Sequence, residues 1–339
     1  MLLRNIVSRE ELKRRMDVDT RPYTTVSFYC YQSIDSPSLF RDALYKDWQQ
    51  FGVVGRVYLA NEGINAQVAM PSVYFEGFKE SLYKIDFLNG IRLNTAIEET
   101  QKAFIKLDIK VKSKIVADGI EDPTFNPSNT GNYLEAENWN SYLEDSNTVV
   151  IDMRNHYESE VGRFENAQCP DADTFRDELK MVIDEYEDNK DKRILMYCTG
   201  GIRCEKASAW MKHNGFNEVY HLKGGIINYV REVKEKQLEN KYKGVNFVFD
   251  QRLHERVSND ILAVCHQCGE AADVHINCAN TGCHLLFIQC EKCAQKYNKC
   301  CSEACAAVIE LPEDVQKELR KGKPAGRIFS KGRFKQSVQ

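Results

Sequence analysis

The chain has 339 residues, which at roughly 150 residues per domain predicts two or three domains. Hydrophobic residues at 42% and charged residues at 28% are ordinary for a soluble protein, and they exclude a fibrous or wholly disordered chain. The net charge of -4 gives no general sign of nucleic-acid binding, and no uncharged stretch reaches the roughly 18 residues of a membrane span. Charged residues from Arg4 onward interrupt the start of the chain before a secretory signal forms, so we expect a cytoplasmic protein.

The first third of the chain predicts a ferredoxin-like or acylphosphatase-like domain of element order βαββαβ, preceded by a polar N-terminal helix. Its predicted elements are a strand over 24–34, a helix over 37–48, strands over 53–60 and 64–70, a helix over 72–83 and a strand over 104–117. The two middle strands form a hairpin that turns at Asn61-Glu62-Gly63. We assign residues 1–118 to this domain.

Residues 119–132 are rich in proline, asparagine and glycine, which predicts a linker. Beyond the linker strands alternate with helices, and this order predicts a parallel sheet covered on both faces over residues 133–243. The predicted elements are helices over 134–143, 174–186, 204–214 and 229–243, and strands over 148–153, 193–197 and 219–222.

Cys198 stands directly after a buried strand of this second domain, at the sheet edge where open α/β folds bind their ligands. The loop continues as Thr199, Gly200, Gly201, Ile202 and Arg203. The glycines let the backbone turn tightly, and the helix that follows presents free N–H groups to the sulfur. Arg203 adds a fixed positive charge, so the loop favours a thiolate that acts as a nucleophile or carries a persulfide. Cys204 is a possible accessory residue, which either resolves an oxidised Cys198 or caps the first helical turn.

The Cys-x-x-Gly-x-Arg pattern of this loop resembles the active-site loop of the rhodanese family. Residues 150–154, followed by Glu158 and Gly162, resemble the opening strand and turn of that domain, although Arg163 stands where histidine is common. Residues 222–226 resemble its closing strand and turn, so the resemblance covers about residues 130 to 235. A cysteine phosphatase needs a longer Cys-x5-Arg loop, which this chain lacks. We expect Asp152 and Arg154 to form a structural ion pair.

The chain has 13 cysteines, and most of them lie between residues 265 and 305. The candidate metal ligands are Cys265, Cys268, Cys278, Cys283, Cys290, Cys293, Cys300, Cys301 and Cys305. Disulfides are disfavoured in a cytoplasmic chain, and short paired spacings suit tetrahedral zinc, so we predict two structural zinc ions over residues 244–312. An interleaved arrangement joins the first pair to the third and the second pair to the fourth, which leaves one of Cys300 and Cys301 surplus. A group of buried thiols without metal, or an iron–sulfur site, are the alternatives.

Residues 313–339 form a basic tail, in which eight lysines and arginines between positions 317 and 335 face a single glutamate. Such a tail either contacts nucleic-acid phosphates or serves only as a solubilising end.

The order of these parts resembles the bacterial tRNA uridine hydroxylases, over about residues 20 to 310. The resemblance implies oxygen-dependent formation of 5-hydroxyuridine at the tRNA wobble position, with Cys198 in the active site, tRNA as partner and molecular oxygen as cosubstrate. It therefore implies an oxidoreductase of monooxygenase type. Asn61, Glu62 and Asn65 lie in a shared motif and either touch substrate or only form the hairpin turn.

The residues alone do not reach hydroxylation, because the chain contains no flavin or nicotinamide motif. They support two alternatives, a rhodanese-type sulfurtransferase with a persulfide on Cys198 and a non-catalytic RNA-binding protein stabilised by zinc. The oligomeric state stays open.

Overall fold

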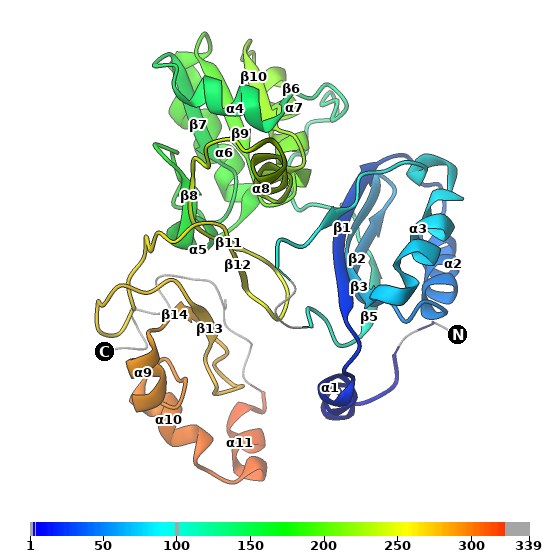
Figure 1. Cartoon of the computed structure of the whole chain (residues 1–339), viewed down its shortest axis with the longest axis vertical. Coiled ribbons are helices and arrows are strands. Elements are labelled where there is room, and N and C mark those ends of the chain that lie inside the picture. The colour runs from blue at the N-terminus through cyan, green and yellow to red at the C-terminus, as the bar shows by residue number, and fades with distance from the viewer. Residues whose placement is uncertain (1–2, 4, 99–101, 323–339) are drawn as a thin grey trace.

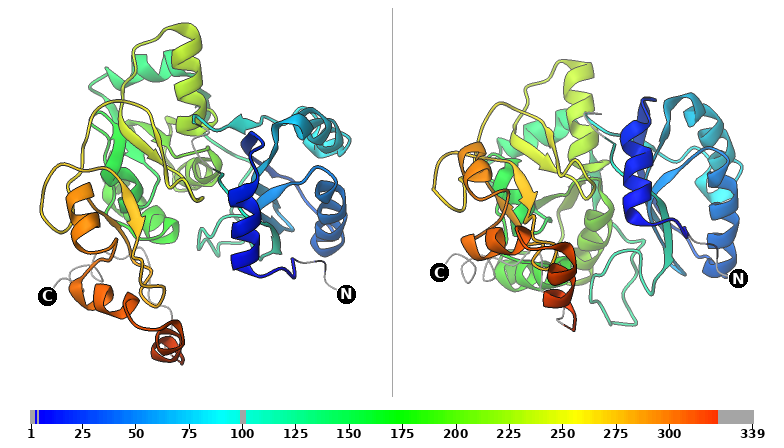
Figure 2. Two further views of the ribbon diagram at one scale, coloured as in Figure 1. Left: turned by 60° about the horizontal axis from the view of Figure 1, so that its bottom comes forward. Right: turned by 90° about the horizontal axis from the view of Figure 1, so that it is seen from below.

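The computed structural model describes residue 3, residues 5–98 and residues 102–322 (Figure 1). An N-terminal sheet domain lies beside a central parallel-sheet domain, and a cysteine-rich region follows the central domain in the chain (Figures 1 and 2). None of the helices in these described ranges is long and apolar enough to cross a membrane.

The N-terminal domain consists of α1 (Arg9–Val18), β1 (Tyr23–Tyr31), α2 (Pro37–Gln49), β2 (Val54–Ala60), β3 (Gly63–Pro71), α3 (Phe75–Tyr83), β4 (Asn94–Thr95) and β5 (Leu107–Val111). The sheet order is β4-β1-β3-β2-β5. Helices α2 and α3 cover one face of this sheet, where Trp48 packs edge-on against Phe28 and Phe78 in the core (Figure 1).

Strand residues that point away from this core are mostly polar because successive side chains of a strand alternate between faces. The polar sheet face, as we call it, comprises Ser27, Tyr29, Arg56, Tyr58, Asn65 and Gln67. It is turned toward the central domain, and its six residues line a cavity between the two domains.

The acylphosphatase-like fold class is confirmed, but the predicted strand over 104–117 is wrong in extent and in role. Only Leu107–Val111 form a strand, which pairs parallel to β2 at one sheet edge. The final strand of the βαββαβ order is β4, which pairs with β1 at the opposite edge. A strand of two residues is too short to show the alternation of polar and apolar residues by which strands are predicted.

The central domain consists of β6 (Asn132–Leu134), α4 (Ala136–Leu143), β7 (Thr148–Asp152), α5 (His156–Val161), β8 (Gly162–Phe164), α6 (Phe175–Tyr186), β9 (Arg193–Tyr197), α7 (Ile202–His213), β10 (Val219–Leu222) and α8 (Gly225–Lys236). Its parallel sheet has the order β6-β10-β9-β7. Strand β9 is buried on both faces, with Met196 in one core cluster and Leu195 in the other. The predicted ion pair of Asp152 and Arg154 is present, fully buried, at 2.6 Å.

The predicted helix over 229–243 is also wrong at both ends. Helix α8 begins four residues earlier, after Gly224 adopts a left-handed conformation with φ of 70°. It ends at Lys236 because Gln237 is left-handed too, with φ of 55°. The chain then forms strand β11 (Tyr242–Phe247), which pairs with β8 and so attaches the cysteine-rich region to the central domain.

The remaining elements are β12 (His254–Arg256), β13 (His275–Asn277), β14 (Leu286–Ile288), α9 (Glu291–Lys296), α10 (Glu303–Ile309) and α11 (Glu313–Arg320). The first part of the predicted basic tail is therefore helical, and residues 323–339 of that tail lie outside the described residues.

Candidate active site and metal centres

Cys198 is delivered by strand β9 to the carboxyl edge of the central sheet, as the sequence predicts. Gly201, with φ of 101°, turns the loop so that helix α7 begins at Ile202. The carbonyls of Cys198 and Thr199 accept hydrogen bonds from the backbone N–H groups of Ile226 and Ile227 in the first turn of α8, at 3.0 and 3.2 Å. A Cβ at Gly225 would lie 2.5 Å from the Cys198 carbonyl oxygen, so only glycine permits this close packing.

The environment of the Cys198 sulfur favours the thiolate. Burial by itself raises its pKa, but the Cys204 thiol, the Arg203 charge and the amides of Cys204 and Gly201 outweigh burial and lower the pKa to about 6. The Gly201 N–H donates to Sγ at 3.1 Å. Burial raises the pKa of Cys204 well above its usual range, so this thiol stays protonated and donates to Cys198. Cys198 is therefore largely ionised at neutral pH, as a nucleophile requires.

Arg203 directs its two terminal nitrogens at Glu158, and no hydrogen bond joins it to the Cys198 sulfur among the described residues. The guanidinium forms two hydrogen bonds to the Glu158 carboxylate, of 2.7 and 2.9 Å, and Glu158 is fully buried. Arg203 therefore acts on Cys198 through its charge rather than by direct contact. Glu158 in turn is fixed by the backbone N–H of Asn155, at 3.0 Å, which forms part of the capping box of α5.

Cys198 lines a cavity of about 470 Å³ between the polar sheet face and the loop of the central domain. This volume falls in the range of about 300–1,000 Å³ that is usual for small-molecule sites. The residue is 1% exposed, so a substrate has to enter this cavity to meet the sulfur. The loop residues Thr199, Gly200, Ile202 and Arg203 line it as well.

Of the three predicted accessory residues in the hairpin motif, the structure brings only Asn65 to this cavity. Asn61 donates to the Ile34 carbonyl at 3.0 Å and stabilises the turn. Glu62 accepts hydrogen bonds from the Ile115 amide and from Lys206 of α7, both at 2.7 Å. Asn61 and Glu62 therefore hold the backbone and the domain boundary in place.

Many of the other cavity residues were not predicted from the sequence, among them Arg56, Gln67 and Phe249. Arg56 forms no ion pair within the part of the chain that the structure describes. Phe249 follows β11 and is 38% exposed, with the Arg203 guanidinium 5.9 Å from its ring centre. The only sequence signal for Arg56 and Gln67 is the polar alternation of their strands, which does not show what the polar face meets.

The predicted metal ligands form two groups of four thiols, and all sulfur atoms within each group lie within 4.8 Å of one another. The first group is Cys265, Cys268, Cys290 and Cys293, and the second is Cys278, Cys283, Cys301 and Cys305. The interleaved pairing is therefore confirmed among the described residues, and Cys300 is the surplus cysteine.

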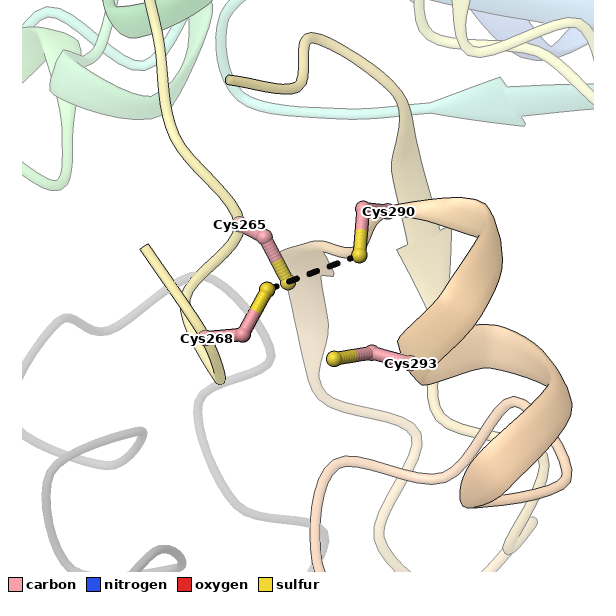
Figure 3. A group of neighbouring side chains, drawn as sticks. All are labelled: Cys265, Cys268, Cys290 and Cys293. Atoms are coloured by element: carbon pink, nitrogen blue, oxygen red, sulfur yellow. Dashed lines mark hydrogen bonds between the residues drawn. The ribbon is translucent and has the colours of Figure 1, made fainter. Parts of the chain in front are cut away.

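In the first group, Cys265 and Cys268 on one loop face Cys290 and Cys293 at the start of α9 (Figure 3). The sulfur atoms of Cys268 and Cys290 are 3.6 Å apart. In the second group, Cys283 and Cys301 are separated by 3.7 Å. A tetrahedral ion with metal–sulfur bonds of about 2.3 Å places its thiolates about 3.8 Å apart. Both groups can therefore bind a tetrahedral metal ion.

Family models match most of the chain. A model described as UPF0176 acylphosphatase like domain matches residues 23–115, one described as Rhodanese-like domain matches residues 135–232, and one described as Rhodanase C-terminal matches residues 243–306.

Curated relatives match over nearly the full length. The chain is 54% identical to the tRNA uridine(34) hydroxylase of Salmonella arizonae, over 98% of this chain and 95% of the relative. It is 54% identical to the protein of the same name from Pectobacterium atrosepticum, over 98% of this chain and 94% of the relative. The one from Escherichia fergusonii is 52% identical over 100% of this chain and 97% of its own length.

Proposed function

Because the chain belongs to the family of tRNA uridine(34) hydroxylases, we propose that it is an oxidoreductase that converts the wobble uridine of tRNA to 5-hydroxyuridine, with Cys198 as its active-site residue. The observation that supports this role most directly is that Cys198, whose pKa is lowered to about 6, lines a cavity of nucleotide-compatible volume. A tRNA substrate also implies that the enzyme works in the cytoplasm.

A base has to leave its stack before it can meet a sulfur atom inside a cavity, and a base in a single-stranded loop leaves most readily. The Cys198 thiolate then adds to C6 of the uracil ring. A C6–S bond forms, and the electron pair of the C5=C6 double bond moves onto C5 and O4. C5 becomes a nucleophile toward an oxygen electrophile. Loss of the C5 proton and expulsion of the thiolate afterwards restore the double bond and the free enzyme.

We assign molecular oxygen as the oxidant, in a reaction of monooxygenase type. One oxygen atom enters the new C5–O bond and the other leaves as water. The overall reaction therefore takes two electrons and two protons from a reductant outside the chain. The protein residues contribute the nucleophile, its ionisation and the cavity that holds the base.

Nucleoside mass spectrometry of tRNA tests the proposed reaction. In a strain that lacks this gene, we expect wild-type protein to restore 5-hydroxyuridine and Cys198→Ser to restore none. Cys169→Ser is the matched control, since Cys169 does not line the cavity. The absence of product with wild type would refute the reaction, and wild-type levels with Cys198→Ser would refute the role of that cysteine.

The covalent step has its own test. RNA with 5-fluorouridine at the wobble position lacks the C5 proton that the last step removes, so we expect a stable adduct with Cys198. Peptide mass spectrometry locates the adduct. If wild-type protein forms no adduct, addition at C6 is wrong even when hydroxylation is observed.

We propose that each cysteine group holds one structural zinc ion. Four thiolates at tetrahedral spacing are the ligand set that zinc favours in structural sites. The cysteine-rich region has small core clusters that consist partly of the cysteines themselves. Metal binding would supply stability that so small an apolar core lacks.

Sulfur transfer is a second candidate function, favoured by the loop alone. The same amides and the same low pKa would stabilise a persulfide on Cys198. Transfer of sulfur from thiosulfate to cyanide by wild type, lost in Cys198→Ser, would support it.

A further inference from the structure

Two side chains of the polar sheet face, Asn65 and Gln67, form a chain of hydrogen bonds with the backbone carbonyl of Ile115. We call these three amide groups the amide relay. Asn65 Nδ2 donates to the Ile115 carbonyl oxygen at 3.3 Å. Gln67 Nε2 donates to Asn65 Oδ1 at 2.5 Å. All three residues line the cavity that contains Cys198, and the proposed chemistry uses none of them.

The amide relay lies next to the strand residues that contact the Cys198 loop. Ser27 of β1 is paired with Gln67 of β3, and Tyr29 is paired with Asn65. A Cβ built on Gly200 would lie 4.0 Å from Ser27 Oγ, and one on Gly201 would lie 2.8 Å from Tyr29 Oη. The loop therefore packs against the direct neighbours of the relay, and both line the same cavity.

The amide relay also fixes which end of the Gln67 carboxamide is an acceptor. The Ile115 carbonyl can only accept, so Asn65 presents its amino group there and its oxygen to Gln67. That oxygen requires a donor, so Gln67 turns its amino group toward Asn65. Gln67 Oε1 has no hydrogen-bond partner among the residues that the structure describes. Rotation of the Gln67 carboxamide by 180° would set two oxygens against each other.

We propose that Gln67 is the residue that selects uracil over cytosine, by accepting a hydrogen bond from uracil N3–H at its fixed acceptor Oε1. This inference rests on the proposed function, because it assumes that the base enters the cavity of Cys198. The remaining N–H of Gln67 can donate to O4 of the same base. Asn65 is a positioning residue, which acts through Gln67.

Cytosine cannot form the two hydrogen bonds with the Gln67 carboxamide that uracil forms. Its N3 is an acceptor and its exocyclic N4 is a donor, so it opposes the Gln67 carboxamide at both atoms. A site built to pair one hydrogen-bond pattern leaves buried polar groups unpaired when the other pattern enters. We expect a preference for uridine of about tenfold or more.

The test measures binding without turnover. The affinities of the full-length chain for two anticodon stem-loop RNAs, one with uridine and one with cytidine at position 34, give a selectivity ratio. We expect Gln67→Met to bring the ratio from about tenfold or more to about one. Asn65→Ala keeps Gln67 but releases its orientation, so its ratio falls too. Gln49→Met, the same change on the exposed surface of α2, leaves the ratio unchanged.

Alkylation of Cys198 at the wild-type rate shows that a variant has kept its loop. The inference is overturned if folded Gln67→Met protein has the same selectivity ratio as wild type. It is also overturned if the wild-type protein itself has a ratio near one. If Gln67→Met does not fold, a selectivity ratio in Asn65→Ala that equals that of wild type overturns the inference instead.

Failure of the proposed function gives a different result. Wild-type protein that binds the uridine RNA selectively but forms no 5-hydroxyuridine refutes the reaction and leaves the role of Gln67 intact. If wild-type protein hydroxylates uridine and Gln67→Met keeps the wild-type selectivity ratio, the role of Gln67 is refuted and the reaction is not.

Discussion

Lys206 of α7 and Glu62 of the N-terminal hairpin form an ion pair across the boundary of two domains, with 2.7 Å between Nζ and Oε2. Lys206 is 2% exposed and also contacts the carboxylate of Asp118. Because Lys206 lies only about one turn from the start of the helix that follows Cys198, this pair holds the polar sheet face against the Cys198 loop.

Loss of this lysine should weaken the whole chain. We expect Lys206→Met to lower the free energy of unfolding by about 1–3 kcal/mol, because Glu62 loses its buried cation and Asp118 keeps only Lys114 as an ion-pair partner. Chemical denaturation measures the change. Lys46→Met, at an exposed position on α2, is the control and should change stability by less than about 0.5 kcal/mol. An equal effect of both variants would show that the pair contributes nothing specific.

The reactivity of Cys198 should follow a pKa of about 6. Alkylation requires the thiolate, so the rate should be half-maximal at about pH 6 and level off above it, whereas an ordinary thiol is half-maximal only at about pH 8.5. Cys204→Ala removes a hydrogen bond that lowers this pKa, so its midpoint should move to higher pH. Peptide-resolved mass spectrometry over a pH series measures both midpoints. A midpoint near 8.5 in the wild type would contradict the description of the loop.

Arg56 should contact a phosphate of the bound RNA, since it is the cavity cation that forms no ion pair among the described residues. We expect Arg56→Met to weaken binding of an anticodon stem-loop RNA at low salt and to reduce the dependence of log K on log salt by about 0.7–1. Its effect should be the same for uridine and cytidine RNAs. Lys46→Met removes a charge of the same sign from the far side of the domain. If the slope of log K against log salt falls equally in Arg56→Met and Lys46→Met, the effect comes from net charge and not from a contact of Arg56.

The metal content should distinguish two adjacent cysteines. We expect two zinc ions per chain in the wild type and in Cys300→Ser, because Cys300 belongs to neither group of four thiols. Cys301→Ser removes a ligand and should lose one ion. Elemental analysis of purified protein measures the ratio. Loss of zinc in Cys300→Ser with retention in Cys301→Ser would reverse the assignment.

Much of the central domain could be predicted because its signals are local. A continuous apolar run marks β9, glycines mark the turn after it, and the Cys198 loop follows directly. The pairing of the cysteine groups could be proposed from spacing alone, although only the fold shows which of Cys300 and Cys301 is left over.

The features that were missed depend on contacts distant in sequence. Strand β4 exists because β1 offers it an edge, and nothing within its two residues indicates a strand. The partner of Arg203 is Glu158, which lies 45 residues away, so the loop pattern itself does not show where the guanidinium points. The role of Gln67 likewise depends on which domain packs against the polar sheet face, and no strand pattern contains that information.

The docking of the N-terminal domain has a consequence for the cysteine itself. A thiol that is ionised at neutral pH is more readily oxidised than an ordinary thiol of equal exposure. Here the N-terminal domain covers the cavity that contains the sulfur, and Cys198 is only 1% exposed. The contact between the domains thus limits how much of a reactive atom is exposed to oxidants in solution.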